Sequence, residues 1–386
     1  MTRLAVLAAL ALAAAQAAFA QEPVKIGVVA PFSGVAADYG KQMEGGIKAF
    51  FKLHGDTFAG RKIQILIRDT GGPNGEVAKR LAQELVTRDN VDFLAGFGFT
   101  PEALAAAPVA TEAKKPMVVM NAASSVVTTR SPYIARFSMA LPQVSAPMAT
   151  WAAKNGIKKV YTLVADYAPG IDSESAFKKE FEARGGQVVD SVRVPLRNPE
   201  FAPFVQRIKD AKPEAVFMFV PAGEQSIGFM KAFEERGLAK EGIKVIATGD
   251  LTDDDVLNSM GDPVMGVITS HHYSAAHDSG ENKAFVKAFG EVGKELKRPN
   301  FMAVGGYDGM AAIAEVVKKL GNNIDGDKAM EILKGYKATS PRGPISIDPA
   351  TRDIVQTVYI RRVEKRGGEY WNVEFDKFEN VKDPGK

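Results

Sequence analysis

The residues best suited to chemistry lie in segment 96–110, which reads GFGFTPEALAAAPVA and follows the short apolar run NVDFLA. The segment offers a hydroxyl at Thr100, rings at Phe97 and Phe99, and two glycines, and its second half has the small residues of a helix. It contains no His, Cys or Lys. Backbone N–H groups, a hydroxyl and an aromatic face favour holding a ligand over cleaving one.

Similar small, hydroxyl and aromatic residues follow other strand-like runs. They occur in APFSGVAADYG (30–40), RDTGG (68–72), NAASS (121–125), ADYAPG (165–170), PAGEQ (221–225) and TGDLTDD (248–254). Each segment alone is explained by ordinary loop and helix-cap chemistry. In a parallel sheet, however, ligands bind at the carboxyl ends of the strands, where helix N-termini point N–H groups outward. The recurrence therefore predicts one shared binding site.

Three other motifs are weaker. HHYSAAH places His271, His272 and His277 together, but no Cys or suitably spaced carboxylate completes a zinc site. One imidazole could hydrogen-bond the far end of a ligand, although a solvated hinge histidine is the favoured interpretation. DLTDDDVL lacks the Gly and Glu of a calcium loop, so its acids are expected to cap a helix beginning near Asp253. GFGF lacks the third glycine of a dinucleotide fingerprint, and we predict no metal, cofactor or catalytic residue.

Strand-like runs alternate with helical patterns along the chain. Strands are predicted at 24–30, 61–69, 91–96, 117–121, 158–166, 185–194, 215–220 and 243–250. Helices are predicted at 41–53, 76–89, 101–114, 171–184, 200–211, 225–236, 281–296, 302–320 and 328–335, and a hairpin at 354–371. The alternation predicts mainly parallel sheets flanked by helices, and its restart near residue 158 predicts two α/β lobes.

Composition and the first residues indicate cellular location. The 386 residues are 46% apolar with a net charge of +3 at pH 7, which gives no indication of a nucleic-acid partner. Residues 1–20 combine Arg3 with an apolar stretch ending in small residues, so we expect a signal peptide cleaved before Gln21. This stretch is too short for membrane insertion. Because the chain has no cysteine for a disulfide or a lipid, we expect an exported, soluble protein of a Gram-negative periplasm.

Several segments keep a specific order and spacing: KIGVVAPFSGVAADYG, GGIKAFF, GRKIQILIRDTGG, GFGFTPEALAAAPVATEAKKPMVV, YIARFSMALPQ, AVGGYDGMAAIAEVV and GPISIDPATRD. In these segments the chain resembles the branched-chain amino-acid type of periplasmic solute-binding protein, which delivers ligands to ABC importers. The resemblance implies a type I periplasmic binding fold whose lobes are joined by hinge crossings. The N-terminal lobe is expected at 21–140 plus 273–345, and the C-terminal lobe at 141–272 plus 346–386.

The resemblance also implies ligand-binding residues in the first lobe. Tyr39 matches an aromatic residue that leans over the ligand. Thr100 matches a serine that binds the ligand carboxylate, and Ser124 matches a threonine that grips the same group beside the Ala122 backbone.

The second lobe departs from the amino-acid pattern. Pro169 stands where relatives carry a tyrosine, with Tyr167 two residues earlier. The chain has no aromatic residue at 220–223, where the amino-acid binders carry one, and the glutamate that meets the ligand ammonium falls near Gly249, with Asp250 the nearest carboxylate. A buried ammonium without an acidic partner costs several kcal/mol, so we expect the ligand to be a carboxylate without an ammonium.

The aromatic residues near these positions suit a flat ligand. Phe32, Tyr39, Phe99 and Tyr167 would supply apolar walls for a ring, which favours an aromatic acid such as a benzoate or phenylpropenoid derivative. The predicted ligand-binding residues are Phe32, Tyr39, Phe99, Thr100, Asn121, Ala122, Ser124, Tyr167, Gly223 and Asp250.

The predicted function is that of a monomeric, non-enzymatic substrate-binding component of an ABC transporter, with the importer's membrane subunits as partners. A binding protein for branched-chain or other hydrophobic amino acids and a sensory subunit are alternatives within the same fold. A periplasmic α/β hydrolase is the alternative from another class. It is disfavoured because the sequence has no Gly-x-Ser-x-Gly or His-Glu-x-x-His motif.

Overall fold

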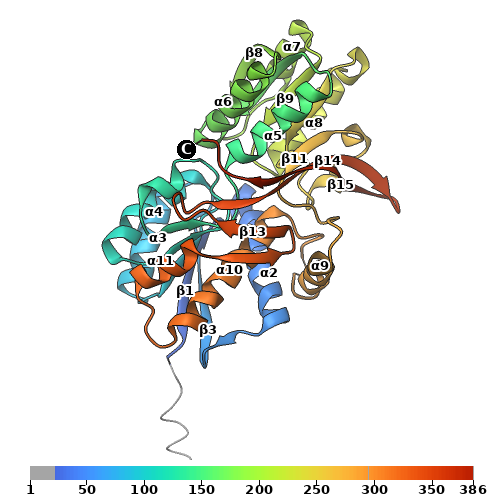
Figure 1. Ribbon diagram of the computed structural model, residues 1–386. Helices are drawn as coiled ribbons and strands as arrows, with labels where there is room; N and C mark the ends of the chain where they lie inside the picture. Colours follow the sequence, from blue (N-terminus) through green and yellow to red (C-terminus); the bar gives the residue numbers. More distant parts are fainter. Residues whose placement is uncertain (1–21, 294, 386) are drawn as a thin grey trace, which may run out of the picture.

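The computed structural model describes residues 22–293 and 295–385, so the predicted signal peptide, 1–20, lies outside the described residues. Two β-sheets flanked by helices form two lobes, and the long red strands near the C-terminus lie between them (Figure 1). The two-lobed α/β prediction is confirmed. None of the helices in the described part of the chain is long and apolar enough to cross a lipid bilayer.

The first sheet is parallel except at one edge, where β2 runs antiparallel to β3. Its order is β2 (Thr57–Phe58), β3 (Arg61–Asp69), β1 (Val24–Ala30), β4 (Phe93–Gly96), β5 (Met117–Val119) and β6 (Ile134–Arg136). The central β1 is apolar along nearly its whole length because helices cover both faces of a parallel sheet. Its helices are α2 (Ala37–His54), α3 (Gly75–Thr87), α4 (Thr100–Ala113), α9 (Gly280–Val292), α10 (Phe301–Leu320) and α11 (Gly326–Lys334).

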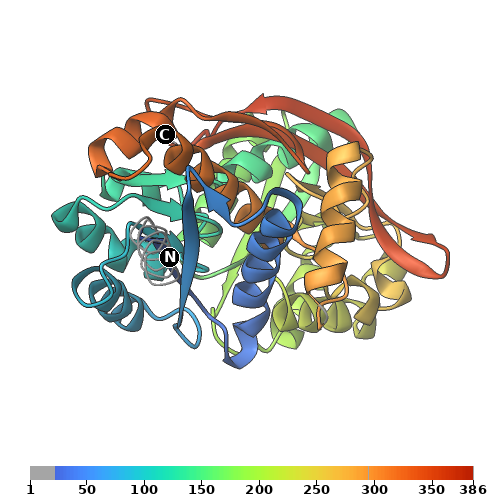
Figure 2. The same cartoon turned by 90° about the horizontal axis from the view of Figure 1, so that it is seen from below.

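Helices from distant parts of the chain pack together on this lobe. Figure 2 shows α2 beside α9, and α2 also packs against α10. The approach of α2 to α10 needs glycine, because a Cβ on Gly46 would lie 1.8 Å from the carbonyl oxygen of Ala303. The last helices thus complete the lobe that the first strands begin.

The second sheet has nine strands. Along its main path they are β12 (Lys337–Ser340), β13 (Gly343–Ile347), β14 (Ile354–Arg366), β11 (Ile268–His271), β10 (Lys244–Thr248), β9 (Ala215–Phe219), β7 (Lys159–Ala165) and β8 (Gln187–Val194). The ninth, β15 (Glu369–Val381), pairs with β14 as the predicted hairpin. Strands β11 to β8 are parallel, and the helices of this lobe are α5 (Leu141–Lys154), α6 (Ala168–Ala183), α7 (Ala202–Ala211) and α8 (Glu224–Glu235).

The last strands connect the lobes. Ile345 and Ile347 of β13 are hydrogen-bonded into the second sheet, yet their side chains belong to the apolar core shared with the first sheet. The expected boundary between residues 345 and 346 therefore falls inside a strand. Short segments such as 137–140 and 272–279 make the other crossings.

The prediction of a helix beginning near Asp253 is wrong. The chain makes turns there, followed only by the short 3-10 helix η4 (Leu257–Ser259). Asp253 and Asp254 are buried instead, and they accept hydrogen bonds from Asn300 and Asn372 at 3.2 and 3.1 Å. These carboxylates are held by amide groups far away in the sequence, and they do not cap an α-helix.

Candidate functional site

A small inner cavity lies where the strand ends of the two lobes face each other. Its volume is about 20 Å³, enough for about one water molecule. Its lining combines polar and aromatic side chains from both lobes: Tyr39, Gly98, Phe99, Thr100, Asn121, Ala123, Met139, Leu141, Tyr167, Pro169, Phe219 and Asp250. A ligand larger than water can enter only if these side chains or the lobes move apart.

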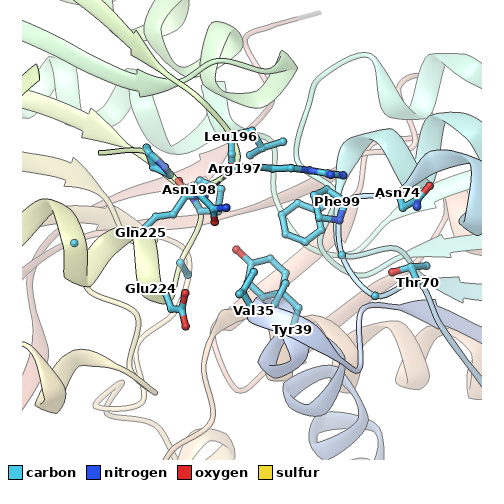
Figure 3. A pocket seen from close by; sticks show the side chains of 18 of the residues that line it. Val35, Tyr39, Thr70, Asn74, Phe99, Leu196, Arg197, Asn198, Glu224 and Gln225 are labelled. Carbon is cyan, nitrogen blue, oxygen red and sulfur yellow. Dashed lines mark hydrogen bonds between the residues drawn. The ribbon is translucent and has the colours of Figure 1, made fainter. Parts of the chain in front are cut away.

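A larger outer cavity of about 550 Å³ adjoins it. Figure 3 shows first-lobe residues such as Thr70 and Asn74 on one side and second-lobe residues such as Asn198 and Gln225 on the other. Tyr39 and Phe99 line both cavities, and their rings are stacked with centroids 4.8 Å apart and an interplanar angle of 10°. The stacked pair thus forms a partition between the outer cavity and the inner one.

Thr100 provides a hydroxyl at the first residue of α4. It is 2% exposed, and its Oγ1 accepts a hydrogen bond from the Ser124 N–H at 3.2 Å. The hydroxyl hydrogen can therefore be donated to a ligand. Because a helix N-terminus attracts negative charge, this end of the inner cavity suits a carboxylate.

Glu102 is a buried acid that the sequence analysis missed. Its carboxylate accepts hydrogen bonds from the Thr70 hydroxyl at 2.5 Å and from the Phe99 N–H at 3.0 Å. Burial raises its pKa to about 7, against the lowering effect of these hydrogen bonds. Glu102 thereby fixes the backbone of Phe99 beside the cavity. Glu102 is the third residue of α4, where a glutamate that bonds back to the N-cap N–H is a recognised capping pattern; its spacing of three residues from Phe99 could have identified it.

The second-lobe end of the inner cavity carries Asp250 and two phenols. Asp250 Oδ2 accepts a hydrogen bond from the Thr248 hydroxyl at 3.0 Å, and burial raises the pKa of this carboxyl to about 7. Burial also raises the pKa values of Tyr39 and Tyr167 well above the usual range, and the charge of Asp250 adds to both shifts. Both phenols therefore keep their protons and can donate hydrogen bonds in the cavity.

The raised pKa of Asp250 predicts a pH-dependent stability of the ligand-free protein. Because the carboxyl binds its proton more tightly in the folded than in the unfolded state, its contribution is present at low pH and lost as pH rises toward 7. Between about pH 5 and 6.5, the free energy of unfolding of wild type should fall by ~1.4 kcal/mol per pH unit relative to Asp250→Asn. Urea denaturation of both proteins measures this difference.

Asp210→Asn serves as the control for this prediction, since Asp210 is an exposed carboxylate on α7. The free energy of unfolding of Asp210→Asn should change with pH in the same way as that of wild type. The same pH dependence of the free energy of unfolding in wild type and Asp250→Asn would contradict the prediction.

The structure brings six of the ten predicted site residues to the inner cavity: Tyr39, Phe99, Thr100, Asn121, Tyr167 and Asp250. Phe32, Ala122, Ser124 and Gly223 line neither cavity. The ring of Phe32 lies against Gly40, and Gly223 precedes α8 as its N-cap residue. The Ala122 N–H already donates to the Phe97 carbonyl at 2.9 Å. Contact of any of the ten with a ligand stays a prediction.

Ser124 makes a contact between the lobes. Its hydroxyl donates to Asp172 Oδ2 at 2.5 Å, and the Ser125 N–H donates to the same oxygen at 3.1 Å. Asp172 belongs to α6 of the second lobe. Sequence reasoning missed this acid because its partners lie almost fifty residues earlier in the chain.

The interpretation of a solvated hinge histidine is wrong for His271 and His272. Both side chains are fully buried, with 0% exposure. Burial lowers the pKa of each well below the usual value, so both imidazoles are neutral.

The chain is similar to known proteins over nearly its whole length. A family model described as periplasmic binding protein matches residues 23–369. A "Leu/Ile/Val-binding protein homolog 6" of Brucella melitensis is 44% identical over 376 residues, which is 96% of this chain and 95% of the relative.

Two solved structures are also similar. A solute-binding protein of an ABC transporter from Rhodopseudomonas palustris BisB5, in complex with 3,4-dihydroxybenzoic acid, is 57% identical with a TM-score of 0.90, covering 94% of this chain and 99% of that one. Its counterpart from R. palustris HaA2, in complex with p-hydroxybenzoic acid, is 44% identical with a TM-score of 0.92 and the same coverage. The hydrolase alternative finds no support among these relatives. The chain belongs to the periplasmic binding protein family and is a substrate-binding protein of an ABC transporter, not an enzyme.

Proposed function

We propose that this protein captures an aromatic carboxylate of the benzoate class between its two lobes and delivers it to the membrane subunits of an importer. It does so as an exported, soluble monomer in the periplasm of a Gram-negative bacterium. The ligand carboxylate is held at Thr100 and the start of α4, and the ring lies between aromatic side chains of both lobes.

The observation that carries the proposal is the pair of flat walls in the inner cavity. Tyr39 and Phe99 stack at 10°, and Tyr167 and Phe219 stack at 16° with centroids 6.1 Å apart. All four rings line the cavity. Parallel ring faces favour a planar ligand, which gains from stacking as well as from apolar burial. The benzoate-type ligands of the two Rhodopseudomonas relatives support this choice.

Capture requires a hinge motion. The inner cavity of about 20 Å³ is too small for a ring, so the ligand enters when the lobes part and Tyr39 and Phe99 separate. It contacts both lobes only after closure, and binding therefore favours the closed state. Ser124 and Asp172, which bond across the lobes, stabilise that state.

A branched-chain amino acid is the second candidate. Asp250 is the observation in its favour, because a buried carboxylate can pair with a ligand ammonium. The name of the Brucella relative points the same way. The two candidates differ in whether the ligand needs an ammonium group.

A thermal unfolding screen tests the proposal. The panel contains benzoate, 4-hydroxybenzoate, 3,4-dihydroxybenzoate, a phenylpropenoate, leucine and valine. A ligand at about 100 times its Kd should stabilise the protein by ~2.7 kcal/mol, and we expect this from aromatic acids alone. Stabilisation by leucine or valine, with no response to any aromatic acid, would contradict the proposal. Recovery of the bound compound unchanged is expected of a receptor.

A further inference from the structure

A buried nitrogen of His271 lies next to Asp250, which lines the second-lobe end of the inner cavity. Asp250 lines the cavity, and Nε2 of His271 lies 3.9 Å from Asp250 Oδ2. Within residues 22–293 and 295–385, this buried Nε2 atom has no hydrogen-bond partner. Buried polar atoms in folded proteins nearly always have one, so an unpaired atom beside a ligand cavity indicates a partner supplied from outside the chain.

The hydrogen bonds around His271 determine its tautomer. The backbone N–H of His272 donates to His271 Nδ1 at 2.9 Å, so this nitrogen carries no proton. The Nδ1 atom of His272 also lies 2.9 Å from His271 Nδ1 and must be the donor of that pair. A neutral imidazole has one N–H, and His271 therefore carries its hydrogen on Nε2. An N–H donor and a carboxylate acceptor thus stand side by side.

We infer that Asp250 and His271 together recognise a hydroxyl group on the ligand ring, so that the preferred ligands are hydroxybenzoates with the hydroxyl opposite the carboxylate. This inference rests on the proposed function. A hydroxyl oxygen can donate to Asp250 and accept from His271 at the same time. An ammonium has no lone pair for His271, and a ring hydrogen or methyl group offers neither contact.

Electrostatics sets the orientation of such a ligand. Asp250 repels a ligand carboxylate when ionised and offers it no attraction when protonated, whereas the N-terminus of α4, where Thr100 lies in the other lobe, attracts it. The charged group therefore faces the first lobe, and the hydroxyl faces the second. Since both contacts exist together only after closure, the hydroxyl contributes to the closed state as well as to affinity.

Isothermal titration of the unaltered protein tests the inference. The Kd values of benzoate, 4-hydroxybenzoate and 4-methoxybenzoate are compared, because the methoxy oxygen accepts but cannot donate. We expect 4-hydroxybenzoate to bind about tenfold to a hundredfold more tightly than either of the others, as hydrogen bonds to a charged group predict. Equal affinity for benzoate and 4-hydroxybenzoate, or full affinity for 4-methoxybenzoate, would overturn the inference.

Two variants assign the preference to residues. In Asp250→Leu, which keeps a similar volume without polar atoms, the ratio of the benzoate Kd to the 4-hydroxybenzoate Kd should fall to near one. In His271→Phe, which keeps a ring without an N–H, the ratio should fall by about threefold to tenfold. His277→Phe is the control, because His277 pairs with Glu374 away from the cavity. If the ratio of the benzoate Kd to the 4-hydroxybenzoate Kd is the same in His271→Phe as in wild type, His271 is not part of the subsite.

The outcomes also separate this inference from the function on which it rests. If benzoates bind equally well with and without the hydroxyl, the inferred recognition of the hydroxyl is wrong and the proposed function stands. If leucine binds, no benzoate binds, and Asp250→Leu abolishes leucine binding, then Asp250 is an ammonium partner and both proposals fail.

Discussion

Replacing Thr100 by valine is expected to weaken the binding of a benzoate-type ligand by about tenfold to a hundredfold. The two side chains have nearly the same shape, so the main change is loss of the hydroxyl that we propose donates to the ligand carboxylate. A hydrogen bond to a charged group contributes roughly 1.5–3 kcal/mol, which gives the stated range. Titration calorimetry with 4-hydroxybenzoate measures the effect. An unchanged Kd would remove Thr100 from the site.

Two further variants separate binding from stability. Valine at 100 also leaves the Ser124 N–H without its acceptor, so we expect some loss of stability. Thr100→Ser keeps the hydroxyl and should retain most of the affinity. Thr111→Val makes the same change near the other end of α4, where the Thr111 hydroxyl bonds Ser131, and the Kd should not move.

The fold could be read from local patterns because most strands are buried on both faces. The runs 24–30 and 61–69 match β1 and β3 residue for residue. The first is a mostly apolar run between turn residues, and the second alternates polar and apolar residues along much of its length. Helix ends were less accurate. The helix predicted at 41–53 begins at Ala37, because small and polar residues at its start carry little helical periodicity.

Within the candidate site, the sequence predicted positions better than contacts. Thr100, Tyr167 and Asp250 meet at the cavity because the carboxyl ends of parallel strands converge. The contact of Ser124 with Asp172 joins two lobes and leaves no local signal. The burial of His271 likewise depends on packing against Phe301, whose ring lies 4.6 Å away but thirty residues later. Such pairings require the tertiary structure.

Replacing Arg342 by methionine is expected to destabilise the protein by ~3–5 kcal/mol, because it leaves a buried carboxylate without its partner. Arg342 is 1% exposed and pairs with Asp308 of α10 at 2.7 Å. It also donates to the Ser138 carbonyl at 3.1 Å and to Gln356 at 3.0 Å. The guanidinium therefore joins α10, one crossing and β14 at the hinge. Urea denaturation measures the loss.

The double variant Arg342→Met/Asp308→Asn tests whether this loss of stability comes from the unpaired Asp308 carboxylate. If it does, the double variant should be more stable than the single Arg342→Met, since the uncompensated carboxylate is gone. Burial already raises the pKa of Asp308, so the single variant should also recover stability as pH falls and the carboxyl gains a proton. The exposed pair of Arg80 and Glu84 on α3 gives the control, and Arg80→Met should change stability by less than about 1 kcal/mol. A double variant less stable than Arg342→Met, with no recovery at low pH, would show instead that the hydrogen bonds of the guanidinium to the crossing carry the stability of the hinge.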